Sequence, residues 1–294
     1  MNGTHFSGVP FFLAMEARSV GIIGVGMIGG SIALAALRTG YRVFLYDSLA
    51  SGLLMESRFR DATVAPSLAE LVSQSRLITL AVPIGSLAEV GAALARLVQP
   101  GQVVSDVASV KRPAVSALAG LLRDRSDYVP SHPMAGSERS GAQAARGDLF
   151  AGAVTLVCRE LARDPASVEL VTDFWTALGT RVVYVPVREH DEMVALMSHL
   201  PHLLAALLVN HVWKTNSAAL ELCGSGFRDT TRIASGSPGL WTDILLSNAD
   251  AVGEQMQLFR RALEEAEALL AKQDAKNLQA LLDDAKQNRD RLSP

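Results

Sequence analysis

Short apolar runs separated by helix-length stretches fill the chain from residue 19 to residue 185. The runs are nearly continuous in Val, Ile and Leu, which is typical of parallel strands buried on both faces. We expect strands at residues 19–23, 42–46, 77–82, 102–105, 128–129, 153–158 and 181–185. Strands that alternate with helices predict an open α/β sheet with helices on both faces.

The pattern changes after Pro186, and no further strand is predicted. Apolar residues then recur at helical spacing, first in a long helix over residues 188–214 that Pro201 could bend. Two more helices are predicted by the repeat Val252, Met256, Phe259, Leu263, Leu270, Leu278, Leu281 and Leu282. The expected architecture is a doubly wound sheet domain over residues 17–186 followed by an all-helical domain over residues 187–294.

Capping signals mark several helix starts. Ser67 with Glu70, and Ser86 with Glu89, match the capping box in which two side chains satisfy the first free N–H groups of a helix. Asp164 directly before a proline predicts a third start.

The first strand runs into a glycine-rich turn with the spacing G-x-G-x-x-G. The strand before it, the helix after it and a second strand ending in an acid together are typical of a dinucleotide-binding unit of Rossmann type. Gly24 permits the tight turn, Gly26 lets a pyrophosphate approach the backbone, and Gly29 allows close packing of helix on strand. Free N–H groups at the helix start then bind the phosphates.

The acid that ends the second strand indicates which dinucleotide binds. We expect Asp47 to hydrogen-bond the adenosine ribose hydroxyls, where its carboxylate repels a 2′-phosphate and Ser48-Leu49 offers no Arg to accept one. This predicts NAD rather than NADP; the alternative is that Asp47 only caps a turn. The predicted NAD contacts are Gly24, Gly26, Met27, Ile28, Gly29, Asp47, Val82 and Pro83.

Composition narrows the range of partners. The formal net charge of −3 offers no concentrated basic face, so no nucleic-acid partner is expected. Hydrophobic residues make up 49% and charged residues 19% of the chain, a balance that favours a buried subunit interface. Cys158 and Cys223 sit among apolar neighbours, which predicts buried, reduced thiols in a reducing compartment.

Two apolar segments resemble membrane signals. No Lys or Arg precedes residues 9–15, so we expect an N-terminal extension rather than a signal peptide. Residues 193–213 are uncharged over a length that could cross a bilayer. They contain His, Asn and Pro residues that are costly in lipid, so we expect a soluble, cytoplasmic protein with no membrane partner.

A polar segment over residues 131–141 lies between the two halves and carries a His, a Glu and an Arg. His132 follows a strand end and precedes a Pro, so we expect a loop to present it beside the nicotinamide. A neutral imidazole with an ordinary pKa of about 6.5 suits a general base, and the alternative is a structural His. Ser109, at a neighbouring strand end, either donates to the same oxygen or caps a helix.

His199 and His202 are three residues apart and therefore share a helix face. No third ligand follows at a recognisable spacing, so no metal is expected. The two side chains either line the site or are buried core histidines. Trp241 is either a core anchor or part of the pocket wall.

Basic residues offer candidate partners for an acidic substrate. Arg232 lies in a cluster with Arg228 and Asp229, and Arg can bind a planar carboxylate through two hydrogen bonds. The alternative is a solvated ion pair at the surface. Arg139 and Lys111 are weaker candidates of the same kind.

Taken together, these stretches resemble the prephenate/arogenate dehydrogenase family of tyrosine biosynthesis. The dinucleotide motif is unspecific, whereas HPMAGSE combined with SHLPH and the Arg-containing segment is highly specific. The resembling segments run in order through nearly the whole chain: GVGMIGGS at 24–31, LAVP at 80–83, DVASVK at 106–111, HPMAGSERSG at 132–141, SHLPH at 198–202 and FRDTTRIASGSPGLW at 227–241.

The resemblance implies a Rossmann domain followed by a helical domain that forms a homodimer. It implies oxidative decarboxylation of prephenate or arogenate with NAD as acceptor. His132 would deprotonate the ring hydroxyl with help from Ser109, and Arg232 would hold a substrate carboxylate. His202, rather than His199, would face the substrate side chain.

Three further points follow from the resemblance. Trp241 matches a pocket position. Arg139 stands where relatives often carry Lys, so the charge is kept. Tyrosine could inhibit by competing at the active site, since no separate regulatory domain is predicted.

Two other functions compete with this one. A β-hydroxyacid dehydrogenase or imine reductase shares the domain plan but generally uses a Lys on the long interdomain helix, and residues 193–213 contain no Lys. A non-catalytic NAD sensor would need no His, Ser and Arg aligned around the nicotinamide.

Overall fold

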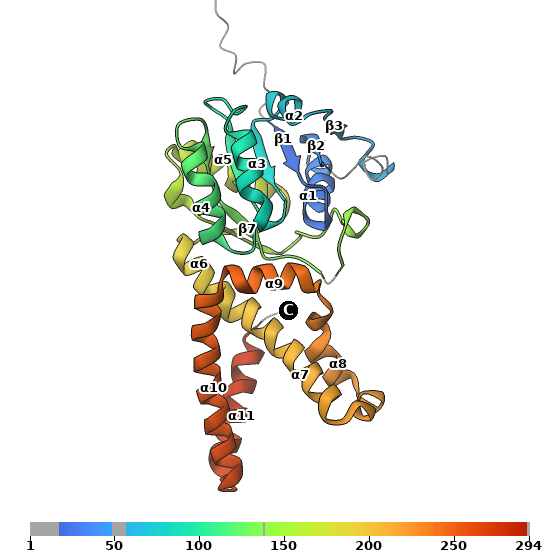
Figure 1. The fold of residues 1–294 in the computed structure, drawn as a ribbon, viewed down its shortest axis with the longest axis vertical. Helices are drawn as coiled ribbons and strands as arrows, with labels where there is room; N and C mark the ends of the chain where they lie inside the picture. The colour runs from blue at the N-terminus through green and yellow to red at the C-terminus, as the bar shows by residue number, and fades with distance from the viewer. Residues whose placement is uncertain (1–17, 49–56, 138, 293–294) are drawn as a thin grey trace, which may run out of the picture.

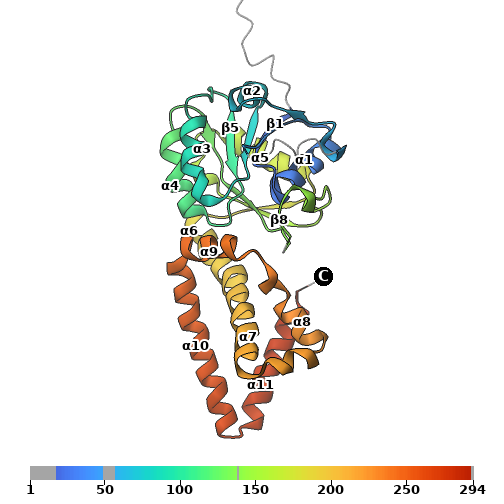
Figure 2. The ribbon, with the colours of Figure 1, turned by 45° about the vertical axis from the view of Figure 1, so that its right-hand side comes forward.

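The computed structural model describes residues 18–48, 57–137 and 139–292. The apolar segment 9–15 and Leu49, both used in the sequence predictions, lie outside these ranges. An α/β domain sits on an elongated helical domain (Figure 1), and the two remain separate layers when the molecule is turned (Figure 2).

The main sheet has six parallel strands in the order β3-β2-β1-β4-β5-β6. The strand order reverses between β1 and β4, and ligands of such sheets bind at this reversal, beyond the carboxyl ends of the strands. Ile23 pairs with Tyr46 on one side and with Leu80 on the other, so three strand ends meet there. The strands are β1 Ser19–Ile23, β2 Arg42–Tyr46, β3 Thr63–Val64, β4 Leu77–Leu80, β5 Val103–Asp106 and β6 Asp127–Tyr128.

Helices cover both faces of this sheet, which confirms the predicted doubly wound fold. Along β2, Val43 and Leu45 enter one hydrophobic core while Phe44 enters the other, which explains the continuous apolar run of this strand. The first core holds α1 and α5, and the second holds α2, α3 and α4. These helices are α1 Met27–Arg38, α2 Leu68–Gln74, α3 Leu87–Leu94, α4 Lys111–Leu122 and α5 Pro165–Ala177.

The strands predicted at residues 153–158 and 181–185 join one unpredicted strand in a separate sheet, whose three strands lie in the order β7-β8-β9. They are β7 Ser131–Pro133, β8 Val154–Val157 and β9 Arg181–Tyr184, with β7 antiparallel to β8 and β8 parallel to β9. The expected loop around His132 is therefore wrong, because His132 lies in β7 and pairs with Leu156. A residue before proline favours extended backbone, which suits a strand.

Two of the three predicted helix caps form. Ser67 accepts a hydrogen bond from the N–H of Glu70 at 3.2 Å, and Asp164 accepts one from the N–H of Ala166 at 2.9 Å. The cap predicted at Ser86 is wrong. A 3₁₀ turn over Ile84–Ser86 leads directly into α3, so Ser86 already has helical dihedrals and its side chain makes no capping bond.

The chain after Val187 is helical throughout the described residues. The helix predicted over residues 188–214 consists of α6, a π-helical segment at Ala195–His199, and α7. Pro201 is the second residue of α7, directly after the π-helical segment. The helices are α6 Val187–Val194, α7 Leu200–Asn216, α8 Ser225–Thr231, α9 Pro238–Ser247, α10 Ala249–Ala271 and α11 Ala275–Asp290.

Among the described residues, Val187–Leu222 is the stretch long and apolar enough to pass a length-and-composition test for a membrane span, with a mean hydropathy of 1.6. Its π-helical segment packs on α10 in a small core of Ala195, Ala251 and Val252. Core helices of soluble domains pass the same test.

Both cysteines are free thiols, as predicted. Cys158 is buried, and burial raises its pKa to about 12. The burial predicted for Cys223 is wrong, since it is partly exposed after the 3₁₀ segment Ser217–Leu222.

Candidate active site

The glycine-rich turn has the backbone that its sequence predicts. Gly24 adopts a φ of +90°, and a Cβ there would lie 2.5 Å from the carbonyl oxygen of Ala81. A Cβ on Gly29 would overlap the carbonyl oxygen of Gly24, so only glycine lets α1 begin this close to β1. A Cβ on Gly26 would meet nothing within 4 Å, so this backbone faces open space.

That open space suits a dinucleotide. Gly26 precedes α1 and supplies no side-chain cap, so no cap side chain competes for the first N–H groups of the helix. Asp47 directly follows β2, and its Oδ2 accepts a hydrogen bond from the N–H of Val25 at 2.7 Å, which holds the carboxylate beside the turn. Val82 and Pro83 follow β4 at the neighbouring strand end. These residues fit the adenosine and pyrophosphate parts of NAD.

A cavity of about 400 Å³ begins at this turn and extends to the helical domain. Its walls come from α1, β7, the π-helical segment, α7 and the start of α9. Of the residues singled out from the sequence, it collects Met27, Ile28, Ser109, His132, His199, His202, Arg232 and Trp241. Residues of both domains thus close one chamber.

His132 is joined to two residues that the sequence analysis did not single out. Its Nδ1 lies 2.9 Å from Nε2 of His190, and Nδ1 of His190 lies 2.8 Å from Oδ1 of Asp191. Burial lowers the pKa of His132 well below its ordinary value, and the nearby basic groups His190, Lys111 and His199 add to this because each disfavours a positive charge on the ring. The expectation of an ordinary pKa is therefore wrong, and His132 is neutral at neutral pH. The Glu-His-Asp run at residues 189–191 was the available signal.

The expectation that Lys111 is a candidate partner for an acidic substrate is wrong. Lys111 is fully buried and paired with Asp106, and its Nζ also donates to the carbonyl oxygen of Ser131 at 2.6 Å. Tyr128 completes the cluster by donating from its hydroxyl to Asp106 at 2.7 Å. This buried pair anchors the residue that precedes His132.

The two histidines of the SHLPH segment take different positions. His202 stacks on Trp241 with ring centroids 3.5 Å apart and planes 12° apart, so Trp241 is part of the pocket wall. The Nδ1 of His202 is buried without a hydrogen-bond partner among the described residues. Nδ1 of His199 lies 3.2 Å from Nδ2 of Asn248, and burial lowers the pKa of His199 to about 4. His202 is therefore better placed to receive a ligand.

The basic residues proposed to bind an acidic substrate lie in different places relative to the cavity. Arg232 lines the cavity, whereas Arg228 and Asp229 are exposed on α8. Arg139 is exposed, its backbone N–H donates to Oγ of Ser137 at 3.2 Å, and it is not among the described residues that line the cavity. No group of three His, Cys, Asp or Glu side chains within the described ranges could hold a metal ion.

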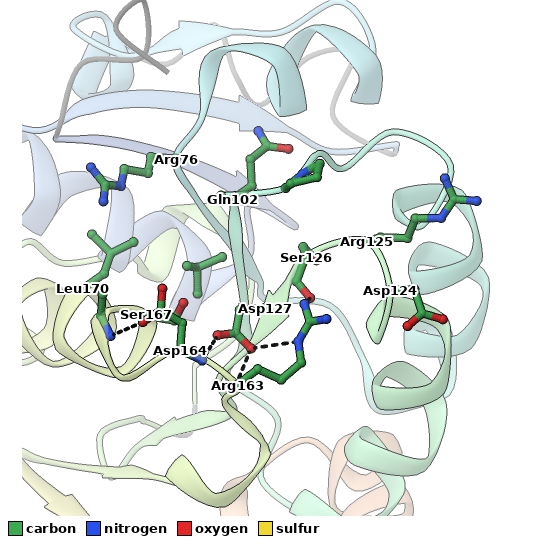
Figure 3. Close-up of a pocket in the computed structure, with 14 residues that line it drawn as sticks. Arg76, Gln102, Asp124, Arg125, Ser126, Asp127, Arg163, Asp164, Ser167 and Leu170 are labelled. Atoms are coloured by element: carbon green, nitrogen blue, oxygen red, sulfur yellow. Dashed lines mark hydrogen bonds and ion pairs between the residues drawn. The ribbon is translucent and has the colours of Figure 1, made fainter. Parts of the chain in front are cut away.

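A second cavity, of about 520 Å³, lies at the amino ends of β5 and β6. Figure 3 shows contacts among one group of its polar residues, centred on Asp127 and Arg163. Asp127 accepts hydrogen bonds from the N–H groups of Arg163 at 3.0 Å and Asp164 at 2.9 Å, and the Arg163 side chain donates to the carbonyl oxygen of Ser126 at 2.7 Å. These contacts close the turn before α5, at the edge of the sheet opposite the glycine-rich loop.

Comparison with known proteins gives two family matches that together span most of the chain. Residues 33–184 match the nucleotide-binding domain of prephenate dehydrogenase, and residues 186–284 match its dimerization domain. The cyclohexadienyl dehydrogenase of Zymomonas mobilis is 30% identical over 87% of this chain and 90% of its own length. The prephenate dehydrogenase of Bacillus subtilis is 31% identical over 92% of this chain and 75% of its own.

Solved structures agree with these matches. Prephenate dehydrogenase from A. aeolicus, crystallised with hydroxyphenyl propionate and NAD+, is 27% identical, with a TM-score of 0.86 over 95% of this chain and 100% of that one. An imine reductase from Pseudomonas sp. has a TM-score of 0.54 at 16% identity, a likeness of fold alone. The chain therefore belongs to the prephenate dehydrogenase family.

Proposed function

We propose that the protein oxidatively decarboxylates prephenate to 4-hydroxyphenylpyruvate with NAD as hydride acceptor and His132 as base. The observation that carries this proposal is the single chamber that joins the glycine-rich turn, His132 and Arg232. The relative solved with NAD+ supports the choice of cofactor. Asp47 beside the turn favours NAD over NADP, because its carboxylate repels a 2′-phosphate.

NAD+ held at the glycine-rich turn and Asp47 would supply the acceptor for the hydride at C4 of the substrate ring. His132 takes the proton of the C4 hydroxyl, while Ser109 donates a hydrogen bond to the same oxygen. The ring carboxylate leaves as CO₂, and its electron pair moves through the ring toward the new carbonyl. The carbonyl oxygen recovers the proton from His132, so the ring becomes a phenol and the base is regenerated.

The chemistry of the chamber favours prephenate over arogenate. Prephenate and arogenate both carry two carboxylates. Arogenate also carries an ammonium group, which needs a hydrogen-bond acceptor in the site. Among the described residues, the lining contains Arg232 and three histidines but no Asp or Glu. We assign a substrate carboxylate to Arg232 and the side-chain end to His202, stacked on Trp241. Arg139 stays a weaker prediction for the same role.

We also propose that the protein is a cytoplasmic homodimer. The match to a dimerization domain and the exposed apolar side chains of α10 support the dimer. Inhibition by tyrosine stays a prediction, in which tyrosine occupies the same chamber as the substrate.

The test is NADH absorbance with prephenate and arogenate in parallel, each with and without tyrosine. We expect kcat/KM for prephenate to exceed that for arogenate at least about tenfold, the discrimination that one unpaired charged group commonly costs. Arg232→Ala should raise KM for prephenate, whereas Arg228→Ala, exposed on the preceding helix, is the matched control. If no NADH forms with prephenate or with arogenate, the proposed reaction is refuted. A preference for arogenate refutes only the choice of substrate.

A further inference from the structure

Three side chains form a continuous hydrogen-bonded chain that leads away from the chamber. His132 lies on its wall, and behind it His190 and Asp191 are fully buried. The distances are 2.9 Å from Nδ1 of His132 to Nε2 of His190, and 2.8 Å from Nδ1 of His190 to Oδ1 of Asp191. Both distances are those of well-formed hydrogen bonds.

The position of each proton in this hydrogen-bonded series follows from the state of Asp191 at its end. Burial alone would raise the pKa of Asp191, but hydrogen bonds from His190 and from the N–H groups of Lys111 and Arg112 outweigh it, so its pKa is lowered. Asp191 is thus a carboxylate and can only accept. Nδ1 of His190 must therefore carry the hydrogen.

The same reasoning extends to His132. Burial lowers the pKa of His190, and this effect outweighs its bond to Asp191, so the ring is neutral. A neutral imidazole protonated at Nδ1 has a lone pair at Nε2. That lone pair accepts from Nδ1 of His132, and Nε2 of His132 is left as its unprotonated nitrogen.

We infer that His190 and Asp191 are positioning residues that hold His132 in the Nδ1–H tautomer and so present Nε2 as the base. The catalytic consequence rests on the proposed function; the tautomer does not. When Nε2 takes the substrate proton, Nδ1 keeps its hydrogen and continues to donate to His190. No proton passes to Asp191, whose negative charge stabilises the imidazolium through His190.

Residues of both domains hold Asp191, the last member of this hydrogen-bonded series, in place. Asp191 lies on α6, and it accepts from the N–H groups of Lys111 at 2.7 Å and Arg112 at 2.9 Å at the start of α4. The Arg112 side chain also binds Asp191 at 3.1 Å and continues to Asp250 of α10 at 2.6 Å. The orientation of His132 therefore depends on the seam between the domains.

Two substitutions at His190 separate positioning from packing. His190→Phe keeps a buried ring but removes the acceptor for Nδ1–H of His132, whereas His190→Gln keeps an acceptor oxygen near the Nε2 position. We expect His190→Phe to lower kcat about 10²- to 10⁴-fold, as loss of the correct tautomer does in other His-dependent enzymes. His190→Gln should stay within about tenfold of wild type. KM for prephenate and Kd for NAD should change little in either.

Nitrogen-15 NMR of histidine-labelled protein at neutral pH reads the tautomer directly, with His132→Asn and His190→Phe assigning the signals. We expect proton-bearing Nδ1 and bare Nε2 at both His132 and His190 in the wild type, and loss of the Nδ1–H preference at His132 in His190→Phe. A proton on Nε2 of wild-type His132, or unchanged kcat in folded His190→Phe, overturns the inference. An inactive wild type with the expected tautomers instead refutes the proposed reaction and leaves the positioning intact.

Discussion

Burial lowers the pKa of four histidines on or behind the chamber wall: His132, His190, His199 and His202. Each is therefore neutral at neutral pH. In acid, each takes up a proton when the protein unfolds, and this proton uptake favours the unfolded state. This gives single residues a measurable effect on stability. His199 is the best suited to a test, because its pKa falls to about 4.

Stability should fall as the pH drops below the pKa of an unfolded histidine, about 6.5. The folded pKa of His199 is lower, so the unfolded chain takes up the proton first and stability is lost from about pH 6.5 toward pH 4. Between pH 7.5 and 5, urea unfolding should show wild type losing about 2 kcal/mol more than His199→Gln, which does not titrate. Parallel pH profiles of the two proteins would contradict this assignment.

Motifs located most of the residues that line the chamber, because each motif places a chemical group at a strand end or on a helix face. His132, Ser109, His202, Arg232 and Trp241 all reach it. His190 was missed because its contact with His132 joins residues 58 positions apart, and Asp191 because it reaches His132 only through His190. Spacing along the chain does not predict such contacts, nor the burial that lowers the pKa.

Among the elements, those defined by local periodicity were predictable. The unit β1–α1–β2 needs only its own apolar pattern and glycines, and it forms as expected. The apolar pattern revealed β8 and β9 but not the short strands β3 and β7, nor the separation of β7-β8-β9 from the main sheet, because these depend on pairing between distant segments. The π-helical segment Ala195–His199 also carries no period that a helical repeat would show.

Gly26→Ala tests the role of the glycine-rich turn as a cofactor site. An added Cβ meets no protein atom within 4 Å, so the unfolding temperature should be unchanged. The methyl group instead occupies the approach of the pyrophosphate, and Kd for NAD should rise about tenfold or more. Gly253→Ala on α10, also without a neighbour within 4 Å, is the matched control. Unaltered NAD binding in Gly26→Ala would place the cofactor elsewhere.

For the whole molecule, the α/β and helical parts meet along a seam that also holds the chamber. Arg112 on α4 binds both Asp191 and Asp250 there. Large apolar side chains remain exposed on the helical part, among them Leu258, Leu263 and Leu270 of α10. The apolar composition predicted such a surface, but not its location.

Association through α10 should bury these side chains. We expect wild type to sediment at twice the 31.3 kDa mass of the chain. Leu263→Glu should weaken the dimer by placing a charge in the interface, while Leu121→Glu, at an exposed site on α4, should leave it intact. A wild-type protein that stays monomeric at micromolar concentration would exclude this association.

The central claim, that His132 is the base, is tested most directly by single-turnover NADH formation from prephenate in His132→Asn, together with Kd for NAD. We predict a rate about 10²- to 10⁴-fold below wild type, with Kd for NAD unchanged. A variant that binds NAD normally and oxidises prephenate at the wild-type rate would contradict the account.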